Sequence, residues 1–113
     1  MDLSPHQISI LERLAAQGFS IVAFPMYASA VGIRRGECAA LLVAAPGGGL
    51  ILQGEPCHLI HGNLAVGVMR NGKKLYVWKK QSAEATPERE AALREFKQDL
   101  ERELSGPAPP GSI

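Results

Sequence analysis

The side chains best suited to chemistry stand in residues 57–61 (CHLIH), and a second thiol, Cys38, lies upstream. Thiolates and imidazoles are the ligands that zinc prefers, and four of them can complete a tetrahedral site. The spacing disfavours such a site, because Cys57 and His61 would lie about 13 Å apart along a strand. On a helix they would meet, but the flanking proline and glycine leave barely one turn. The ligand pairs of standard zinc motifs are also missing, so we predict no metal site and no cofactor.

A nucleophilic cysteine is the second possibility, because a neighbouring imidazole can take the proton of a thiol. Cys57 precedes His58, and Cys38 would need a histidine from another strand to be brought beside it. Cys38 lies in an apolar run, where a thiol usually behaves as an inert hydrophobic group. The chain has no G-x-S-x-G elbow, H-E-x-x-H helix or dinucleotide fingerprint. We therefore assign no catalytic residue, and a small enzyme remains an alternative.

A ligand-binding protein built around the same stretch is also left open by the sequence. Most acidic residues fall on the last predicted helix, where they form its solvated face. Glu37 and Glu55 differ, because each flanks a predicted strand. A site of this kind requires a concave pocket in which a histidine meets Glu55 or a thiol. The candidate ligand-binding residues are Tyr27, Arg34, Glu55, His58 and His61.

The element that organises the chain is a predicted β-hairpin over residues 64–80 (LAVGVMRNGKKLYVWKK). Asn71-Gly72 tolerates the two positive φ angles of a type I′ turn, and a two-residue turn fixes the register, with Val68 opposite Leu75. Side chains alternate between the two faces of a strand. The predicted core face carries Leu64, Val66, Val68, Leu75 and Val77.

The other hairpin face carries Ala65, Gly67, Met69, Tyr76 and Trp78. It is too apolar to be left in water, so we expect a helix or a second subunit over part of it. Aromatic groups flanked by lysines can also hold single-stranded nucleic acid or another anion, although the usual RNA-binding sheet signature is absent. Paired lysines also protect sheet edges from aggregation. The candidate interaction surface is Met69, Lys74, Tyr76, Trp78 and Lys80.

Two helices frame the predicted strands. Ser4, Pro5 and Gln7 indicate a capped helix over residues 4–17, whose buried stripe holds Ile10, Leu11, Leu14, Ala15 and either Gln7 or Ile8. Residues 86–104 form the second helix, with an apolar stripe of Leu93, Phe96, Leu100 and Leu104. Between them we predict strands over residues 19–24, 27–34, 37–45 and 50–53, the last ending at Glu55-Pro56.

The glycines of residues 46–49 (PGGG) resemble a phosphate-binding loop only superficially. Such a loop joins a strand to a helix and, in its Walker form, adds a lysine. Here a strand pattern follows, so we predict a hairpin turn.

Composition excludes several classes of protein. The chain has 113 residues, 46% of them hydrophobic, which suits one domain. Its 12 basic and 11 acidic residues do not support a general nucleic-acid binder. Residues 28–80 hold seven bases against two acids, whereas residues 84–103 hold seven acids against four bases. The two regions could neutralise each other within a monomer or across a dimer.

Residues 1–20 show no secretion signal and no stretch is long enough to span a membrane, so the predicted location is cytoplasmic.

The sequence therefore predicts an α+β protein with two layers: a mostly antiparallel, five- to six-stranded meander sheet with an N-terminal and a C-terminal helix. Residues 1–104 are expected to form one domain and residues 105–113 a disordered tail. The expected function is a binding or regulatory module that self-associates as a homodimer. Another protein partner is possible, whereas nucleic acid and membrane partners are not expected.

Overall fold

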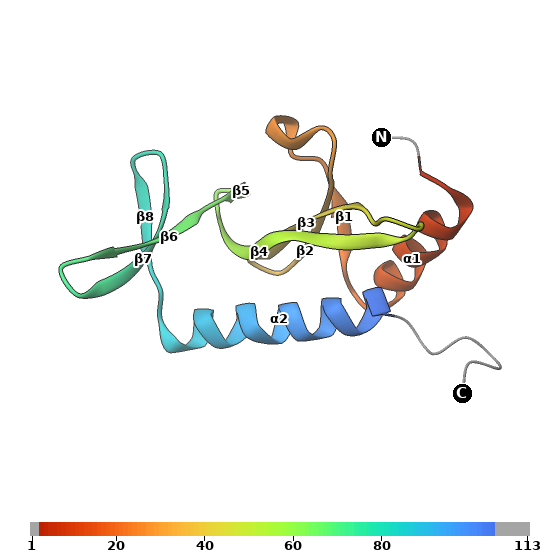
Figure 1. Cartoon of the computed structure of the whole chain (residues 1–113). Helices are drawn as coiled ribbons and strands as arrows, with labels where there is room; N and C mark the ends of the chain where they lie inside the picture. The colour runs from red at the N-terminus through yellow and green to blue at the C-terminus, as the bar shows by residue number, and fades with distance from the viewer. Residues whose placement is uncertain (1–2, 106–113) are drawn as a thin grey trace.

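The computed structural model describes residues 3–105, so that the predicted tail, apart from its first residue, lies outside the described range. The described chain has the predicted α+β architecture, with an N-terminal helix α1 (Pro5–Ala16) and a C-terminal helix α2 (Pro87–Ser105). Its strands are all antiparallel and form two sheets rather than one (Figure 1). Helix α2 passes along one face of the larger sheet, from the smaller sheet to α1.

The five-stranded sheet has its strands in chain order. It contains β1 (Ser20–Val22), β2 (Val31–Arg35), β3 (Cys38–Ala44), β4 (Leu50–Ile60) and β5 (Asn63–Leu64). The three-stranded sheet contains β6 (Val66–Arg70), β7 (Lys73–Trp78) and β8 (Gln81–Glu84). A short 3-10 helix, Pro25–Tyr27, and the turn after it replace the first four residues of the predicted second strand, so β2 begins at Val31. Proline suits the first turn of such a helix because its missing N–H would have no partner there.

Helix α1 begins as predicted, with a capping box at Ser4. The Gln7 backbone N–H donates to Ser4 Oγ at 3.1 Å, and the Ser4 N–H donates to Gln7 Oε1 at 2.9 Å. Gln7 takes the buried position and donates from Nε2 to the Gly49 carbonyl at 3.0 Å, whereas Ile8 and Ala15 are exposed. This bond ties α1 to the β3–β4 turn. The glycine run is therefore part of a hairpin turn between antiparallel strands, as predicted.

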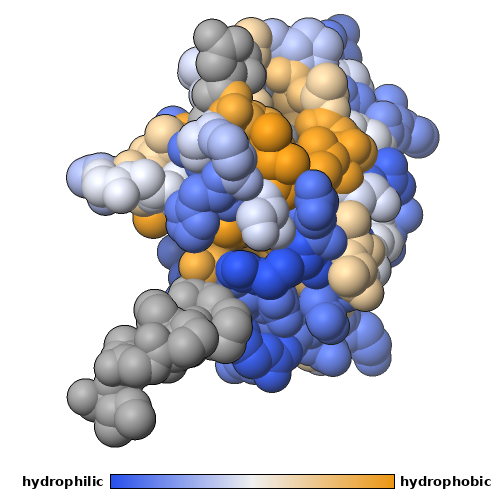
Figure 2. Space-filling model, turned by 90° about the vertical axis from the view of Figure 1, so that its right-hand side faces the viewer, coloured by the Kyte–Doolittle hydropathy of each residue, from blue (hydrophilic) through white to orange (hydrophobic). Residues whose placement is uncertain are grey.

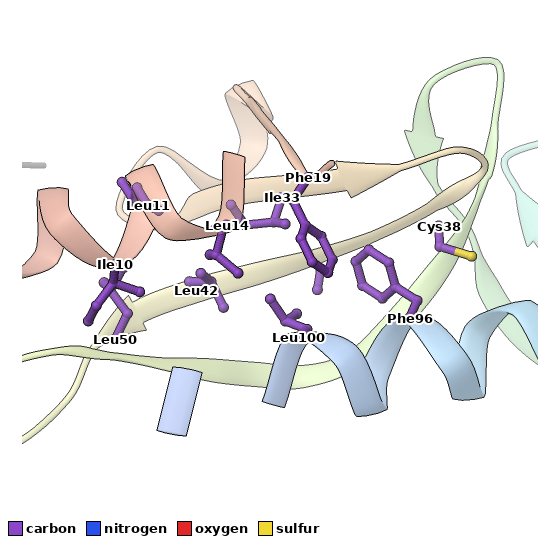
Figure 3. Packing of buried hydrophobic residues seen from close by; sticks show 11 residues of the cluster. Ile10, Leu11, Leu14, Phe19, Ile33, Cys38, Leu42, Leu50, Phe96 and Leu100 are labelled. Carbon is purple, nitrogen blue, oxygen red and sulfur yellow. The ribbon is translucent and has the colours of Figure 1, made fainter. Parts of the chain in front are cut away.

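The main core lies between the two helices and one face of the five-stranded sheet. Figure 3 shows side chains from α1, β2, β3, β4 and α2 meeting there. Phe19 packs edge-on against Phe96, with ring centroids 5.5 Å apart. The predicted stripe of α2 is confirmed, since Phe96 and Leu100 are fully buried and Leu93 and Leu104 pack against the same cluster. The remaining buried members are Ile10, Leu11, Leu14, Ile33, Cys38, Ala40, Leu42 and Leu50.

Strand β4 corrects one prediction, because it continues through Pro56 to Ile60 instead of ending there. Ala39 pairs with Cys57 and Leu41 pairs with Gln53, so Ala40 alone lies opposite residues 54–56. This β-bulge begins at Gly54, whose φ of 69° suits glycine. Proline is tolerated inside a bulge because its missing N–H is not needed for the ladder. The first four residues of the CHLIH stretch are therefore strand, and His61-Gly62 is a turn.

The predicted hairpin forms with its predicted register. Val68 pairs with Leu75 and Gly67 with Tyr76, and both turn residues have positive φ angles, 51° at Asn71 and 77° at Gly72. The predicted core face is wrong: Tyr76 is 3% exposed, whereas Val66 is 61% exposed. The expected cover over the aromatic face is present, because Leu93 of α2 packs there with Ala65 and Tyr76. Burying a tyrosine ring removes more apolar surface from water than burying a valine, so the helix packs on that side.

Ion pairs join the basic strands to the acidic helix within one chain. Arg35 contacts Asp99 at 2.9 Å and Lys74 contacts Glu90 at 2.9 Å. Lys97 of α2 pairs with Glu55 of the β4 bulge at 2.8 Å. Arg35 also lies over the Phe19 ring, 4.6 Å from its centroid. Part of the predicted neutralisation therefore takes place inside the monomer.

We expect Gly32→Ala to destabilise the protein by about 1–3 kcal/mol, because the strand is closely packed at this glycine. A Cβ there would lie 2.5 Å from Phe24 Cδ2 and 2.5 Å from the Val22 carbonyl oxygen. The matched control is Gly67→Ala, where the nearest atom is the flexible Lys74 Cε at 3.1 Å. Its expected change is within about 1 kcal/mol. Urea denaturation measures both variants, and equal stabilities would contradict this account.

Candidate functional site

A cleft of about 640 Å³ lies between the β2–β3 turn and the first half of α2. Its floor is formed by Cys38, His58 and Phe96. Clefts of this size with an apolar floor and a few polar groups are the usual place for a small ligand. Four acidic residues and two arginines line it, a balance that disfavours an anionic ligand. These charged residues are Glu37, Glu88, Glu95, Asp99, Arg35 and Arg89.

The β3–β4 register places Cys38 directly opposite His58. Directly opposed residues share a face, with Cβ atoms about 4.5–5.5 Å apart. The fold thus brings Cys38 beside a histidine from another strand, which is the condition that a nucleophilic pair required. His58 is 6% exposed and its ring stacks on Tyr76, with centroids 4.8 Å apart. The two side chains meet only because β4 continues beyond its bulge.

The electrostatics of the pair oppose nucleophilic catalysis. Burial raises the pKa of the Cys38 thiol, and the nearby Arg35 only partly offsets this effect. Burial lowers the pKa of His58, and the positive charge of Arg89 lowers it further. At neutral pH the pair is therefore a thiol beside a neutral imidazole. A reactive cysteine requires the opposite arrangement, a thiolate beside an imidazolium.

Tyr76 stacks on His58 and is a structural residue outside the lining of this cleft. Burial and the neighbouring Glu90 carboxylate raise the pKa of Tyr76 to about 12, so its hydroxyl stays protonated. The bond to Lys74 lowers the pKa of Glu90 and keeps that carboxylate ionised. Because α2 covers the ring, Tyr76 cannot serve as an open stacking platform for a nucleic-acid base.

The five candidate ligand-binding residues do not share one site. His58 lies in the cleft, whereas Arg34 points to the other face of β2 and donates from Nε to the Gly36 carbonyl at 2.9 Å. Glu55 pairs with Lys97, and His61 is exposed in its turn. Tyr27 lines a separate pocket of about 170 Å³. Within residues 3–105, no three His, Cys, Asp or Glu side chains are placed to hold a metal ion.

The candidate interaction residues do not form one exposed surface either. Met69 is 67% exposed and Lys80 is exposed, but Tyr76 is buried and Lys74 is paired with Glu90. Trp78 is half-buried and lines the small pocket together with Tyr27. Tyr27 of the predicted ligand-binding set and Trp78 of the predicted interaction set therefore line the same pocket. The spacing of these two residues in the sequence does not indicate that they lie near each other.

Cys38 and Glu37 stand out in the sequence, but neither is among the predicted ligand-binding residues. Their place in the cleft follows from the turn at Gly36, which returns the chain so that Cys38 pairs with Arg35. The arginine-glycine pair was a usable signal for that turn. Nothing in the sequence indicates that Glu88 and Arg89 line a cleft, because charged residues at these positions are typical of the solvent-exposed face of a helix.

No protein-family model, curated protein or solved structure matches this chain. Neither helix in residues 3–105 is long and apolar enough to cross a membrane. The inference of function therefore depends on the cleft and on the surfaces of the two sheets.

We expect iodoacetamide to modify Cys38 in the folded protein at least about tenfold more slowly than in the denatured chain near pH 7, because the buried thiol stays protonated. The rate should rise with pH above the ordinary thiol range. Peptide mass spectrometry separates Cys38 from Cys57. The control variant is His58→Phe, which keeps a ring against Tyr76 and should leave the rate unchanged. Fast modification near pH 7 that disappears in this variant would show a thiolate–imidazolium pair instead.

Stability should fall as the pH is lowered from about 7.5 to 5.5, because His58 is neutral in the folded protein and its folded pKa lies below that of the unfolded chain. Between these two pKa values the unfolded chain binds more protons, so acid favours unfolding. His58→Phe should lose this part of the pH dependence. His61→Asn, at an exposed position with a φ of 50° that asparagine tolerates, should keep it. Chemical denaturation at several pH values measures the difference, and identical slopes in all three proteins would refute it.

Proposed function

We propose that this protein is a protein-interaction module that acts as a homodimer, joined through the β6–β7 hairpin. The observation that carries the proposal is the exposure of two large apolar side chains on one strand, Val66 at 61% and Met69 at 67%. Exposed apolar side chains that cluster on one element are typical of interaction sites. A second copy of the chain would remove both from water.

The shape of the molecule supports this proposal. The hairpin turn lies at the end of the molecule opposite α1 and extends beyond the first turn of α2 (Figure 1). The chain measures 53 × 30 × 23 Å, and its radius of gyration is 15.3 Å. A compact domain of 100 residues has a radius of gyration of about 13 Å. The hairpin is therefore an arm with free surface on several sides, which suits contact with a partner.

The two faces of the arm differ in their cover. Helix α2 covers the Tyr76 face, but in the described chain no helix covers the opposite face. That opposite face holds Val66, Val68, Leu75 and Val77. Each Å² of apolar surface removed from water stabilises an association by about 25 cal/mol before the entropic cost of association is subtracted. The hairpin face that the sequence predicts to be the core is therefore an open apolar strip in the monomer.

The alternatives have weaker support. The neutral Cys38–His58 pair opposes the enzyme hypothesis, and the burial of Tyr76 removes one of two aromatic groups needed for stacking on nucleic acid. The cleft remains a candidate for a small neutral or cationic ligand. His58 supports this second candidate, because its side chain is almost fully buried on the cleft floor.

Native mass spectrometry and light scattering test the proposal together. We expect two 12.1-kDa chains per particle, with Val66→Lys raising the dimer dissociation constant at least about tenfold, because a charge would be buried in the interface. The matched control is Ile8→Lys, which places the same charge on an exposed apolar residue of α1. Figure 2 shows hydrophobic surface at that end of the molecule, so this control also tests the competing patch.

A wild-type protein that stays monomeric at high micromolar concentration would refute the dimer. A monomer that retains added mass would instead favour the cleft as a ligand site. Circular dichroism must show both variants folded.

A further inference from the structure

We infer that β6 of one copy pairs antiparallel with β6 of a second copy about a two-fold axis at Val68, which joins two three-stranded sheets into one continuous sheet. This inference rests on the proposed self-association and adds the strand, the direction and the register.

Strand β6 has the least protected of the free strand edges in the described chain. Within residues 3–105 the free edges belong to β1, β5 and the part of β4 before Leu59 in one sheet, and to β6 and β8 in the other. That part of β4 is interrupted by a bulge with a charge and a proline, Glu55 and Pro56. Strand β1 has three residues, β5 has two, and β8 reads QSAE with an acidic end. Strand β6 reads VGVMR, with four uncharged residues before its only charge. Natural proteins protect sheet edges with short strands, charges or proline, so an unprotected edge is a template for another strand.

The exposed side chains of β6 favour a contact at the strand edge over a contact on one face of the sheet. Val66 and Met69 are an odd number of residues apart, so they point to opposite faces of β6. Both are more than half exposed. A partner packed on one face of the sheet would cover only one of them. A strand placed alongside β6 touches both, because its own side chains also alternate between the two faces.

The hydrogen bonds of the three-stranded sheet determine which backbone groups of β6 are free. Ala85 N–H donates to the Lys74 carbonyl at 3.0 Å, so this carbonyl points to the β8 side, away from β6. Lys74 and its partner Met69 are therefore a non-hydrogen-bonded pair of the hairpin, and the Met69 N–H and C=O point outward. The same alternation turns the Gly67 groups outward. Ala65 is already bonded, since its N–H donates to the His58 carbonyl at 3.0 Å.

These free groups select one antiparallel register. Gly67 and Met69 of one copy exchange hydrogen bonds with Met69 and Gly67 of the second copy, which places Val68 opposite its own equivalent. The arrangement is self-complementary, as a two-fold interface requires. Gly67 has no side chain, so it leaves room for the Met69 side chain opposite. Arg70 lies opposite Val66, and its aliphatic stem can pack on that valine.

Charge does not oppose this register. The Arg70 residues of the two copies lie four positions apart along the strands, about 13 Å. This exceeds the screening length of about 8 Å at physiological ionic strength. Lys74, the nearest lysine on the covered face, is already neutralised by Glu90 at 2.9 Å.

Cysteine cross-linking tests the register directly. In a Cys57→Ser background, Val68→Cys should form a disulfide between two copies under mild oxidation, because a non-hydrogen-bonded antiparallel pair has Cα atoms about 4.5 Å apart, within disulfide range. The matched control is Leu75→Cys, on the neighbouring strand β7 and the same face. It should remain reduced, since β7 lies one strand away from the junction in each copy. Non-reducing electrophoresis measures both.

Proline substitution tests the backbone bonds. Met69→Pro removes an outward N–H that the hairpin does not use, so the fold should persist while the dimer dissociation constant rises at least about tenfold. Met69→Leu keeps that N–H and should leave the constant within about threefold. Circular dichroism verifies that both variants fold.

The outcomes separate this inference from the proposed function. A monomeric wild-type protein overturns both. If Val66→Lys weakens the dimer but Val68→Cys stays reduced and Met69→Pro still dimerises, the arm associates through its face, and the strand pairing is overturned while the homodimer stands. A disulfide at position 68 together with dimer loss in Met69→Pro supports the pairing.

Discussion

The fold depends on the packing of one helix, α2, against two separate sheets. Its fully buried Phe96 and Leu100 belong to the core of the five-stranded sheet, whereas Leu93 packs against both that core and the smaller cluster around Tyr76. The stripe of one helix therefore holds the three-stranded sheet beside the larger one. Ion pairs on either side of the stripe, from Arg35 to Asp99 and from Lys74 to Glu90, fix the angle at which the helix lies. The end of β4 completes this cover of the hairpin arm, because His58 stacks on Tyr76 and Ile60 packs in the same cluster.

The same packing determines the chemistry of the cleft. Helix α2 covers Cys38 and His58 closely enough to desolvate both, and desolvation favours the neutral form of each group. A cysteine and a histidine side by side would resemble a catalytic pair from their positions alone. Their burial gives the pair the wrong protonation states for attack on a substrate. Proximity is therefore insufficient evidence for catalysis when the charges are unfavourable.

Helix α2 also determines which surfaces of the hairpin arm stay exposed. Helix α2 covers one face of the β6–β7 hairpin and in the monomer leaves the other face, together with the β6 edge, open to solvent. An alternating strand with apolar side chains on both faces needs a cover on both, and one helix can supply only one. The proposed homodimer satisfies this requirement with a second copy of the same strand. Backbone hydrogen bonds would then give the contact direction and register, while Val66 and Met69 would give it apolar area.

Local patterns in the sequence determined the helix starts, the α2 stripe and the hairpin register, because each depends on residues within a few positions of one another. Only the tertiary structure decided which hairpin face is buried, since both faces are apolar and the choice depends on where Leu93 meets Tyr76. It also decided that β4 passes through Pro56, because the Gly54 bulge and the pairing with β3 compensate for the proline. The meeting of Cys38 and His58 follows from that bulge. Contacts between residues 20 positions apart leave no periodic pattern, so the sequence alone could not place these two side chains together.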